Sequence, residues 1–160
     1  MALAIWDGHG GSEAAEFCAN HFEKFFRHKF SRQPESPGNF NLEETLKDTL
    51  LDLDVGFRRH WQSNTLCPSP SPGTTATVAL IRGGYELCIG HIGDSIALLS
   101  RNKKPKKLTR DHDPSDLMER LRIEEAGGEV TSDAHDTLRV QGRLNMTRSI
   151  GDIGNDTSMA

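Results

Sequence analysis

The first third of the chain carries two stretches in which apolar side chains recur at helical spacing. The first runs from Ser12 to about Phe30, and its apolar stripe consists of Cys18, Phe22, Phe25 and Phe26. The second begins at Asn41, which is typical of a helix N-cap, and Glu44 three residues later completes a capping box. Its stripe consists of Leu42, Leu46, Leu50, Leu53, Phe57 and Trp61. These spacings predict two amphipathic helices.

After residue 73 the pattern changes to short extended segments. Strands are expected over residues 74–82, 85–92, 96–101 and 107–109, with turns at 83–84 and 102–104. A third helix is expected over 115–126 and a further hairpin from 129–131 and 137–140, whereas 31–39 and 67–73 are expected to be loops. Two helices followed by strands on short turns predict an α+β fold, with helices on one face of an antiparallel sheet.

The chain opens with an apolar run, residues 2–6, that ends in Asp7-Gly8-His9 and two further glycines. We expect a short buried strand and then a sharp turn, because glycine lets the backbone bend and approach another group closely. Aspartate is a hard oxygen ligand suited to Mg²⁺ or Mn²⁺, and histidine can carry a proton near neutral pH. An ordinary glycine-rich turn explains the pentapeptide equally well.

A second carboxylate lies at the end of another expected strand. Gly93-Asp94-Ser95 follows the apolar segment 87–92, and two aspartates at two such strand ends can meet in one cleft. Alone, this tripeptide is also an ordinary turn. Together with Asp7, it predicts a shared metal centre.

Length and composition restrict the class of protein. A chain of 160 residues suits one domain, and 35% hydrophobic with 26% charged residues is ordinary for a globular protein. No stretch is apolar enough to span a membrane, no secretory signal is visible, and the net charge of −4 does not favour a nucleic-acid partner. Cys18, Cys67 and Cys88 predict reduced thiols that fill the core in a reducing compartment.

A dense group of cations surrounds the turn at 102–104. Its members are Arg101, Lys103, Lys104, Lys106, Lys107 and Arg110. Lysines on a hairpin commonly protect its edges from aggregation, and this is the interpretation that we favour. The alternative is a docking surface for an anionic partner.

Several short segments occur in a fixed order along the chain. They are residues 4–11 (AIWDGHGG), 73–76 (GTTA), 92–95 (IGDS), 108–114 (LTRDHDP), 126–128 (AGG) and 142–152 (GRLNMTRSIGD). This series resembles the metal-dependent protein serine/threonine phosphatases of type 2C, the PPM family. Within that family, segments 74–80 and 143–152 are most similar to the mitochondrial matrix branch that acts on branched-chain ketoacid dehydrogenase. The resemblance implies a β-sandwich of antiparallel sheets with flanking helices, of which we expect a partial form here.

The resemblance also implies a reaction and a set of roles. In this family a water that bridges two Mg²⁺ or Mn²⁺ ions attacks the phosphorus of phosphoserine or phosphothreonine in line. Asp7 would bridge both ions, the Gly8 carbonyl would complete one coordination shell, and His9 would act as general acid toward the leaving oxygen. Asp94 matches an acidic position associated with a third, weaker ion. Asp152 is expected to be a turn residue only.

The chain departs from the family pattern in ways that bear on activity. Family members have an arginine and an acidic motif before the Asp-Gly-His turn, and two further aspartate motifs after the Ser-Ile-Gly-Asp segment; no part of this sequence resembles them. Two divalent cations about 4 Å apart repel each other by about 17 kcal/mol at an effective dielectric constant of about 20, so several carboxylates are needed to hold them. We therefore expect at most one weakly bound ion and little phosphatase activity.

The sequence thus predicts a partial phosphatase domain over residues 1–152 and a short unrelated tail over 153–160. The expected partner is a phosphorylated protein substrate, with no nucleic acid or membrane, and the expected state is a monomer. An intracellular location is expected, cytoplasmic unless a transit peptide upstream directs the protein to the mitochondrial matrix. The alternative hypothesis is a truncated, catalytically silent form that acts as a protein-binding module.

Overall fold

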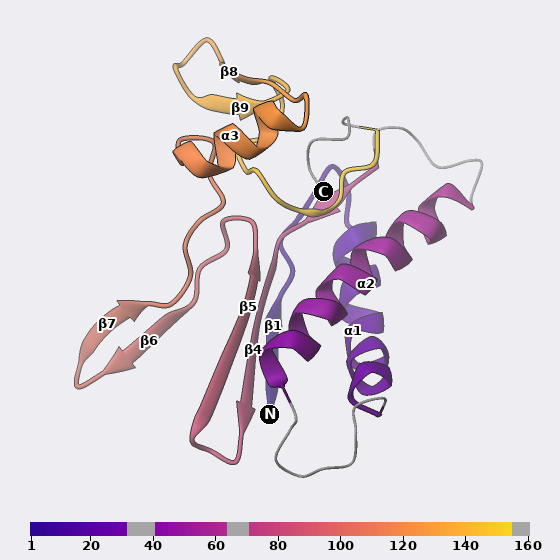
Figure 1. Ribbon diagram of the computed structural model, residues 1–160, viewed down its shortest axis with the longest axis vertical. Helices are drawn as coiled ribbons and strands as arrows, with labels where there is room; N and C mark the ends of the chain where they lie inside the picture. Colours follow the sequence, from indigo (N-terminus) through magenta and orange to yellow (C-terminus); the bar gives the residue numbers. More distant parts are fainter. Residues whose placement is uncertain (32–40, 64–70, 155–160) are drawn as a thin grey trace.

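The computed structural model describes residues 1–31, 41–63 and 71–154 (Figure 1). In these ranges the helices are α1 (Glu13–Ser31), α2 (Leu42–Gln62) and α3 (Leu117–Glu125). The strands are β1 (Ala2–Ile5), β2 (Gly8–His9), β3 (Gly73–Thr74), β4 (Ala76–Arg82), β5 (Glu86–Ile92), β6 (Leu98–Arg101), β7 (Lys104–Lys107), β8 (Val130–Ser132), β9 (Leu138–Val140) and β10 (Ile150–Gly151). All of these strands pair in antiparallel fashion, which confirms the predicted α+β class.

Helix α2 follows the sequence prediction closely. The side-chain oxygen of Asn41 caps it by accepting a hydrogen bond of 3.1 Å from the backbone N–H of Glu44. The whole predicted apolar stripe is buried, with Leu53 and Phe57 fully inaccessible to solvent. Burial of such a stripe, rather than helix propensity, supplies most of the stability of a helix in a folded protein.

Helices α1 and α2 pack side by side and cover one face of the larger sheet (Figure 1). In α1, Cys18 and Phe22 are buried as predicted, and Phe25 packs at the edge of the same core. Gly56 of α2 allows the close approach, because a Cβ atom there would lie only 3.0 Å from the ring of Phe25. The core therefore lies between the two helices and the sheet.

The larger sheet consists of β1, β4 and β5, with β4 in the centre. Gly83 and Gly84 join β4 to β5 with φ angles of +60° and +79°, which is the two-residue hairpin turn that the sequence predicts. Val78 and Leu80 of β4 belong to the core beneath the helices. Because side chains alternate along a strand, Ala79 faces the opposite side of the sheet.

The prediction that the opening strand is buried is wrong. Every residue of β1 is exposed, and Leu3 and Ile5 are 58% and 61% accessible. β1 is an edge strand, and its pairing places Leu3 opposite Ala79, on the face that the helices do not cover. Leu87 of β5 is also exposed, opposite Ile81 on the same face. The sheet thus has one covered face and one apolar face open to solvent, as expected of a partial sandwich.

Beyond β5, strands β6 and β7 form a hairpin that projects away from the larger sheet (Figure 1). The predicted strand over residues 107–109 is wrong, because β7 lies at Lys104–Lys107. Asn102 and Lys103 both have positive φ angles, of 53° and 61°, so they form a two-residue turn that places Arg101 opposite Lys104. The segment Lys104–Lys107 has no apolar alternation from which its position could have been predicted.

Helix α3 and the hairpin β8–β9 share a smaller core. Ile123 and Val140 are fully buried in it, and Val130 and Leu144 pack against them. The predicted hairpin is confirmed, and α3 begins after its N-cap Asp116, whose side chain accepts a hydrogen bond from the backbone N–H of Met118.

Cys18 and Cys88 are buried free thiols, as predicted, and burial raises the pKa of Cys18 to about 12. Cys67 and most of the two predicted loops lie outside the described residues. Ile153, which the prediction places in the tail, donates a backbone hydrogen bond of 2.7 Å to the Ser71 hydroxyl. The domain boundary at residue 152 stays a prediction.

None of the helices described here is long and apolar enough to cross a membrane.

Candidate functional site

A second, very small sheet gathers three distant segments of the chain. Its strand order is β10-β3-β2, with β3 in the centre. Gly8 and Ile150 both pair with Thr74, while His9 and Gly151 both pair with Gly73. The turn that follows the opening strand therefore lies beside the end of the segment that carries Asp152.

The two predicted metal-binding aspartates are linked through Thr75. The backbone N–H of Asp7 donates to the Thr75 hydroxyl at 3.2 Å, and the Thr75 N–H donates to the Asp7 carbonyl at 3.0 Å. The same hydroxyl lies 2.7 Å from that of Ser95, the residue after Asp94. Gly93 turns the chain here with a φ of +94°, and a Cβ atom on it would collide with Thr75. The strand ends that carry Asp7 and Asp94 are thus held together.

Asp7 is exposed and Asp94 is half-buried, and both carboxylates are available to a ligand. In the described part of the chain, neither side chain has a hydrogen-bond or salt-bridge partner, and no group of three or more His, Cys, Asp or Glu residues could hold a metal ion. Magnesium commonly uses only one or two carboxylates and keeps several waters. Two carboxylates therefore suit one divalent ion, but they bring too little negative charge for a pair of ions.

His9 forms a hydrogen bond with Asp152, a residue that the sequence prediction treated as a turn residue only. His9 Nε2 lies 2.8 Å from Asp152 Oδ2, and the Ser149 hydroxyl donates to the same oxygen at 2.5 Å. Since a carboxylate only accepts hydrogen bonds, Nε2 carries the proton of this pair. Asp152 is 5% exposed, and its backbone does form a turn, with a φ of +51°. The prediction was therefore incomplete, because it missed the side-chain contact.

Gly73 makes room for this pair. A Cβ atom at Gly73 would overlap both Asp152 Oδ2 and His9 Nε2. A glycine at this position is therefore required by the close approach of the two side chains to the β3 backbone.

The surroundings of His9 favour its protonated form. The hydrogen bond to Asp152 raises the pKa of His9 above its usual value; burial opposes this, and the charges of Asp152, Asp7 and Asp94 raise the pKa further. His9 Nδ1 is buried and has no hydrogen-bond partner among the described residues. In the protonated ring, Asp152 holds Nε2–H, so Nδ1–H is the proton left for transfer, and Nδ1 has to become accessible before it can reach a leaving group.

A signal for Asp152 exists in the sequence. The tripeptide Ile-Gly-Asp occurs at residues 92–94 and again at 150–152. In both copies the glycine has almost the same backbone angle, with φ of +94° at Gly93 and +95° at Gly151. Comparing the two copies would have identified Asp152 as a candidate site residue.

The segment that carries Asp152 is anchored by Glu119 of α3. Arg148 forms two hydrogen bonds with the Glu119 carboxylate, of 2.7 and 2.8 Å, and the Thr147 hydroxyl donates a third at 2.7 Å. Burial alone would raise the pKa of Glu119, but the hydrogen bonds from Arg148 and Thr147 and the charges of Arg148 and Arg122 lower it to about 2. Glu119 is therefore ionised in the folded protein and ties this segment to α3.

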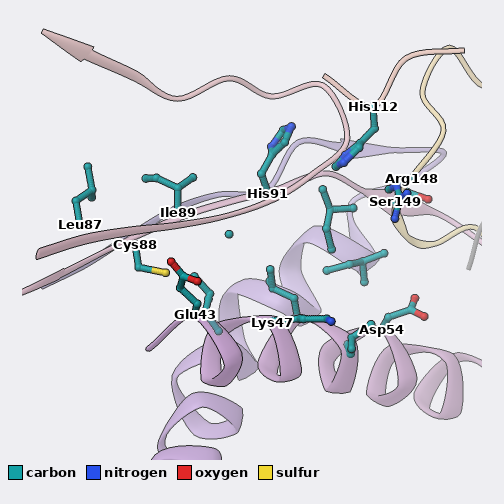
Figure 2. Close-up of a pocket in the computed structure, with 16 residues that line it drawn as sticks. Glu43, Lys47, Asp54, Leu87, Cys88, Ile89, His91, His112, Arg148 and Ser149 are labelled. Atoms are coloured by element: carbon teal, nitrogen blue, oxygen red, sulfur yellow. The ribbon is translucent and has the colours of Figure 1, made fainter. Parts of the chain in front are cut away.

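A separate cavity of about 520 Å³ lies between α2 and β5. Figure 2 shows Glu43, Lys47 and Asp54 on the helix side, with His91 and His112 on the opposite wall. The two histidine rings stack with their centroids 5.0 Å apart, and burial lowers the pKa of both. The cavity borders Ser149, but Asp7, His9, Asp94 and Asp152 are not among the residues that line it, so the candidate site is distinct from this cavity.

Comparisons with known proteins agree with this arrangement. The family model described as Protein phosphatase 2C matches residues 1–156. The chain is 43% identical over 153 residues to Protein phosphatase 1K, mitochondrial, from Xenopus laevis, which covers 96% of this chain and 39% of that protein. It is 36% identical over 151 residues to Probable protein phosphatase 1N from Mus musculus, covering 94% of this chain and 34% of that protein.

A solved structure, that of a C. elegans sex determining protein, matches with a TM-score of 0.87 and 31% identity over 99% of this chain. The chain spans 37% of the length of that protein, and well under half the length of the two phosphatase relatives. Because the family model matches nearly the whole sequence and the fold agrees, the chain belongs to the protein phosphatase 2C family of protein serine/threonine phosphatases.

Proposed function

We propose that the chain provides part of a metal-dependent phosphatase site that acts on phosphoserine and phosphothreonine in proteins. The observation that carries this proposal is the grouping of Asp7, His9 and Asp94 at two strand ends, with Asp152 hydrogen-bonded to His9. An exposed carboxylate next to a histidine with a raised pKa suits hydrolysis that needs both a cation and a proton donor.

Each residue has a distinct part in this proposal. Asp7, with the Gly8 carbonyl and Asp94 nearby, would hold Mg²⁺ or Mn²⁺. Such an ion would supply the nucleophile by lowering the pKa of a water molecule. His9 would donate its proton to the serine or threonine oxygen as that oxygen leaves. Asp152 would keep the His9 ring in one orientation and stabilise its positive charge.

The same geometry limits what this polypeptide can do alone. Asp7 and Asp94 bring two negative charges, whereas two divalent ions about 4 Å apart repel each other by about 17 kcal/mol at an effective dielectric constant of about 20. We propose that the 160-residue chain binds at most one divalent ion, weakly, and turns over phosphoproteins slowly.

The proposal is tested by comparing two substrates in excess Mn²⁺. The leaving group of p-nitrophenyl phosphate needs little help from an acid, whereas the alkoxide of a phosphothreonine peptide must be protonated. We expect slow turnover of both, loss of both in Asp7→Asn, and selective loss of the peptide reaction in His9→Gln. Equal losses on both substrates in His9→Gln would contradict the role of His9 as the acid. Turnover that is unchanged in Asp7→Asn would contradict a metal-dependent site at this strand end.

A second candidate function is a protein-binding module with little turnover. The observation that favours it is the exposed cationic hairpin β6–β7, which projects from the body and takes no part in the site. The two functions are distinguished by the substrate comparison above, since a silent module would hydrolyse neither substrate.

We further propose that the protein is a monomer that acts in the mitochondrial matrix. The support for the location is the 43% identity to a relative whose name includes "mitochondrial". Fractionation of cells that express the endogenous protein, followed by protease protection of isolated mitochondria, tests the location. Recovery of the protein only in the cytosolic fraction would contradict it.

A further inference from the structure

Positive charge is concentrated on one small part of the molecule. Six of the 19 Lys and Arg residues of the chain lie between positions 101 and 110, and none of its 23 Asp and Glu residues lies there. The net charge of the whole chain is nevertheless −4, so the remainder is strongly acidic. The hairpin β6–β7 is therefore a cationic arm on an anionic body.

Four cations of this arm lack the acidic partner that most other cations on the described surface have. Lys107 and Arg110 are neutralised by Asp111 and Asp116, respectively. Arg101, Lys103, Lys104 and Lys106 are exposed, and among the residues with described positions none of the four has an acidic partner. Elsewhere most cations are paired, as in Arg27 with Glu23, Arg58 with Asp54, Arg82 with Glu86 and Arg120 with Glu124.

The register of the hairpin brings three of these cations onto one face. Arg101 lies directly opposite Lys104, and Lys106 lies two residues further along β7. Side chains directly opposite each other are about 5 Å apart, and side chains two residues apart along a strand are about 7 Å apart. Like charges at directly opposed positions destabilise a hairpin. An anionic ligand on this face would relieve that repulsion.

The base of the arm is fixed to the candidate site. The backbone N–H of His112 donates to the Gly93 carbonyl at 2.9 Å, and the Gly93 N–H donates to His112 Nδ1 at 3.0 Å. The N–H of Leu108 also donates to the Ala97 carbonyl at 2.9 Å. Gly93 immediately precedes Asp94, so the arm begins beside a residue of the proposed metal site. Its four-residue strands extend about 13 Å from there.

We propose that Arg101, Lys104 and Lys106 bind an extended acidic segment of a partner protein, and that this segment belongs to the phosphorylated substrate. Only the second part of the inference rests on the proposed function. In an extended segment, alternate side chains point to the same side and are about 7 Å apart. This distance matches the spacing of Lys104 and Lys106 along β7. Binding along the arm would keep a neighbouring phosphorylated residue close to Asp7 and His9.

The charge distribution favours a slender protein segment over a membrane or a nucleic acid. An anionic bilayer or a duplex that lies along the whole arm also comes close to its base, where charges of the acidic body within the Debye length of about 8–10 Å repel it. An extended peptide can contact the arm alone. The protection of hairpin edges explains lysines in general, but it does not require cations directly opposite each other.

The test measures how a hexaglutamate peptide binds to the 160-residue chain. The residues that it contacts are identified from ¹H–¹⁵N spectra, and its dissociation constant is obtained by titration. A hexaglutamine peptide controls for charge. The variant is Arg101→Gln/Lys104→Gln/Lys106→Gln. Its matched control is Lys24→Gln/Lys47→Gln/Arg59→Gln, which removes the same charge from exposed positions on the two long helices.

We expect chemical-shift changes confined to residues 98–107 of the parent chain. In the hairpin variant, the affinity for hexaglutamate should fall by about tenfold or more, because three exposed ion pairs are lost. The helix control should bind within about twofold of the parent chain.

Several outcomes would overturn the proposal. Equal weakening in the two variants would show a general charge effect, and equal binding of hexaglutamine would show that charge is not recognised. Absence of hexaglutamate binding together with binding to phosphatidylserine vesicles would replace the protein partner by a membrane. Because the assay needs neither metal nor turnover, its failure is distinct from a failure of the proposed phosphatase function.

Discussion

His9 and Asp152 are packed into the small sheet and bonded to each other, whereas Asp7 is exposed and Asp94 is half-buried. We call His9 and Asp152 the acid side of the site. There the Asp152 carboxylate accepts hydrogen bonds from His9 and Ser149, and Gly73 makes room for both side chains. The cation side, Asp7 and Asp94, has two strand ends that Thr75 joins, and among the described residues the two carboxylates have no partner. The described residues thus fix the acid side in place, whereas they leave the two carboxylates of the cation side without partners.

This difference separates two kinds of contribution. Interactions on the acid side stabilise the fold whether or not an ion is present, so they can be measured by unfolding. The Asp7 and Asp94 carboxylates contribute little to stability, and their interactions are seen only when an ion is added.

The largest effect is expected from Gly73→Ala. Its Cβ atom would displace both His9 and Asp152, and overpacking together with the lost hydrogen bond should lower the free energy of unfolding by about 3 kcal/mol. Gly84→Ala is the control, because it has a positive φ but nothing within 4 Å, and it should cost only about 1 kcal/mol. Urea unfolding measures both. Equal costs would show that the His9–Asp152 pair does not need the space at Gly73.

Asp152→Asn and Asp7→Asn form a matched pair of charge removals from the two sides. Asp152→Asn should lower the free energy of unfolding by about 2 kcal/mol, because it weakens hydrogen bonds from His9 and Ser149 to a buried carboxylate. Asp7→Asn should change it by less than about 0.5 kcal/mol, because that side chain is exposed. If the two variants were equally stable, the contrast between the sides would be wrong.

Acid should loosen the segment that carries Asp152. The pKa of Glu119 is about 2 in the folded protein and 4.5 without its partners, so its contribution is complete above pH 4.5 and is lost as the pH falls toward 2. Because Arg148 is partly exposed, we expect a loss of about 1–2 kcal/mol over this range. Glu119→Gln should lack this part of the pH dependence. Parallel acid profiles for the two proteins would assign the loss to other carboxylates.

Much of the fold follows from local patterns in the sequence. The helical stripes and the Gly83-Gly84 turn predicted the core elements because period and turn chemistry are local properties. The exposure of Leu3 and Ile5 did not follow, because a continuous apolar run does not show which face another element will cover. The position of β7 depended on positive φ angles at Asn102 and Lys103, which neither residue type requires.

The candidate site was predictable in part for the same reason. Asp7, His9 and Asp94 follow apolar runs with glycines beside them, and that pattern is visible locally. The contact between His9 and Asp152 joins residues 143 positions apart and depends on the pairing of β2 and β10 with β3. Sequence reasoning without topology assigned Asp152 to a turn, which is correct for its backbone but not for its side chain.

We propose that this chain holds one weak divalent-ion site on Asp7 beside the hydrogen-bonded His9–Asp152 pair. Calorimetric titration of Mn²⁺ into the 160-residue chain, into Asp7→Asn and into Asp152→Asn tests it most directly. We expect one ion to bind to the parent chain with a dissociation constant well above the micromolar range. Binding should weaken by about tenfold or more in Asp7→Asn and by less than about threefold in Asp152→Asn. Two ions bound with micromolar affinity, or binding unaffected by Asp7→Asn, would contradict the account.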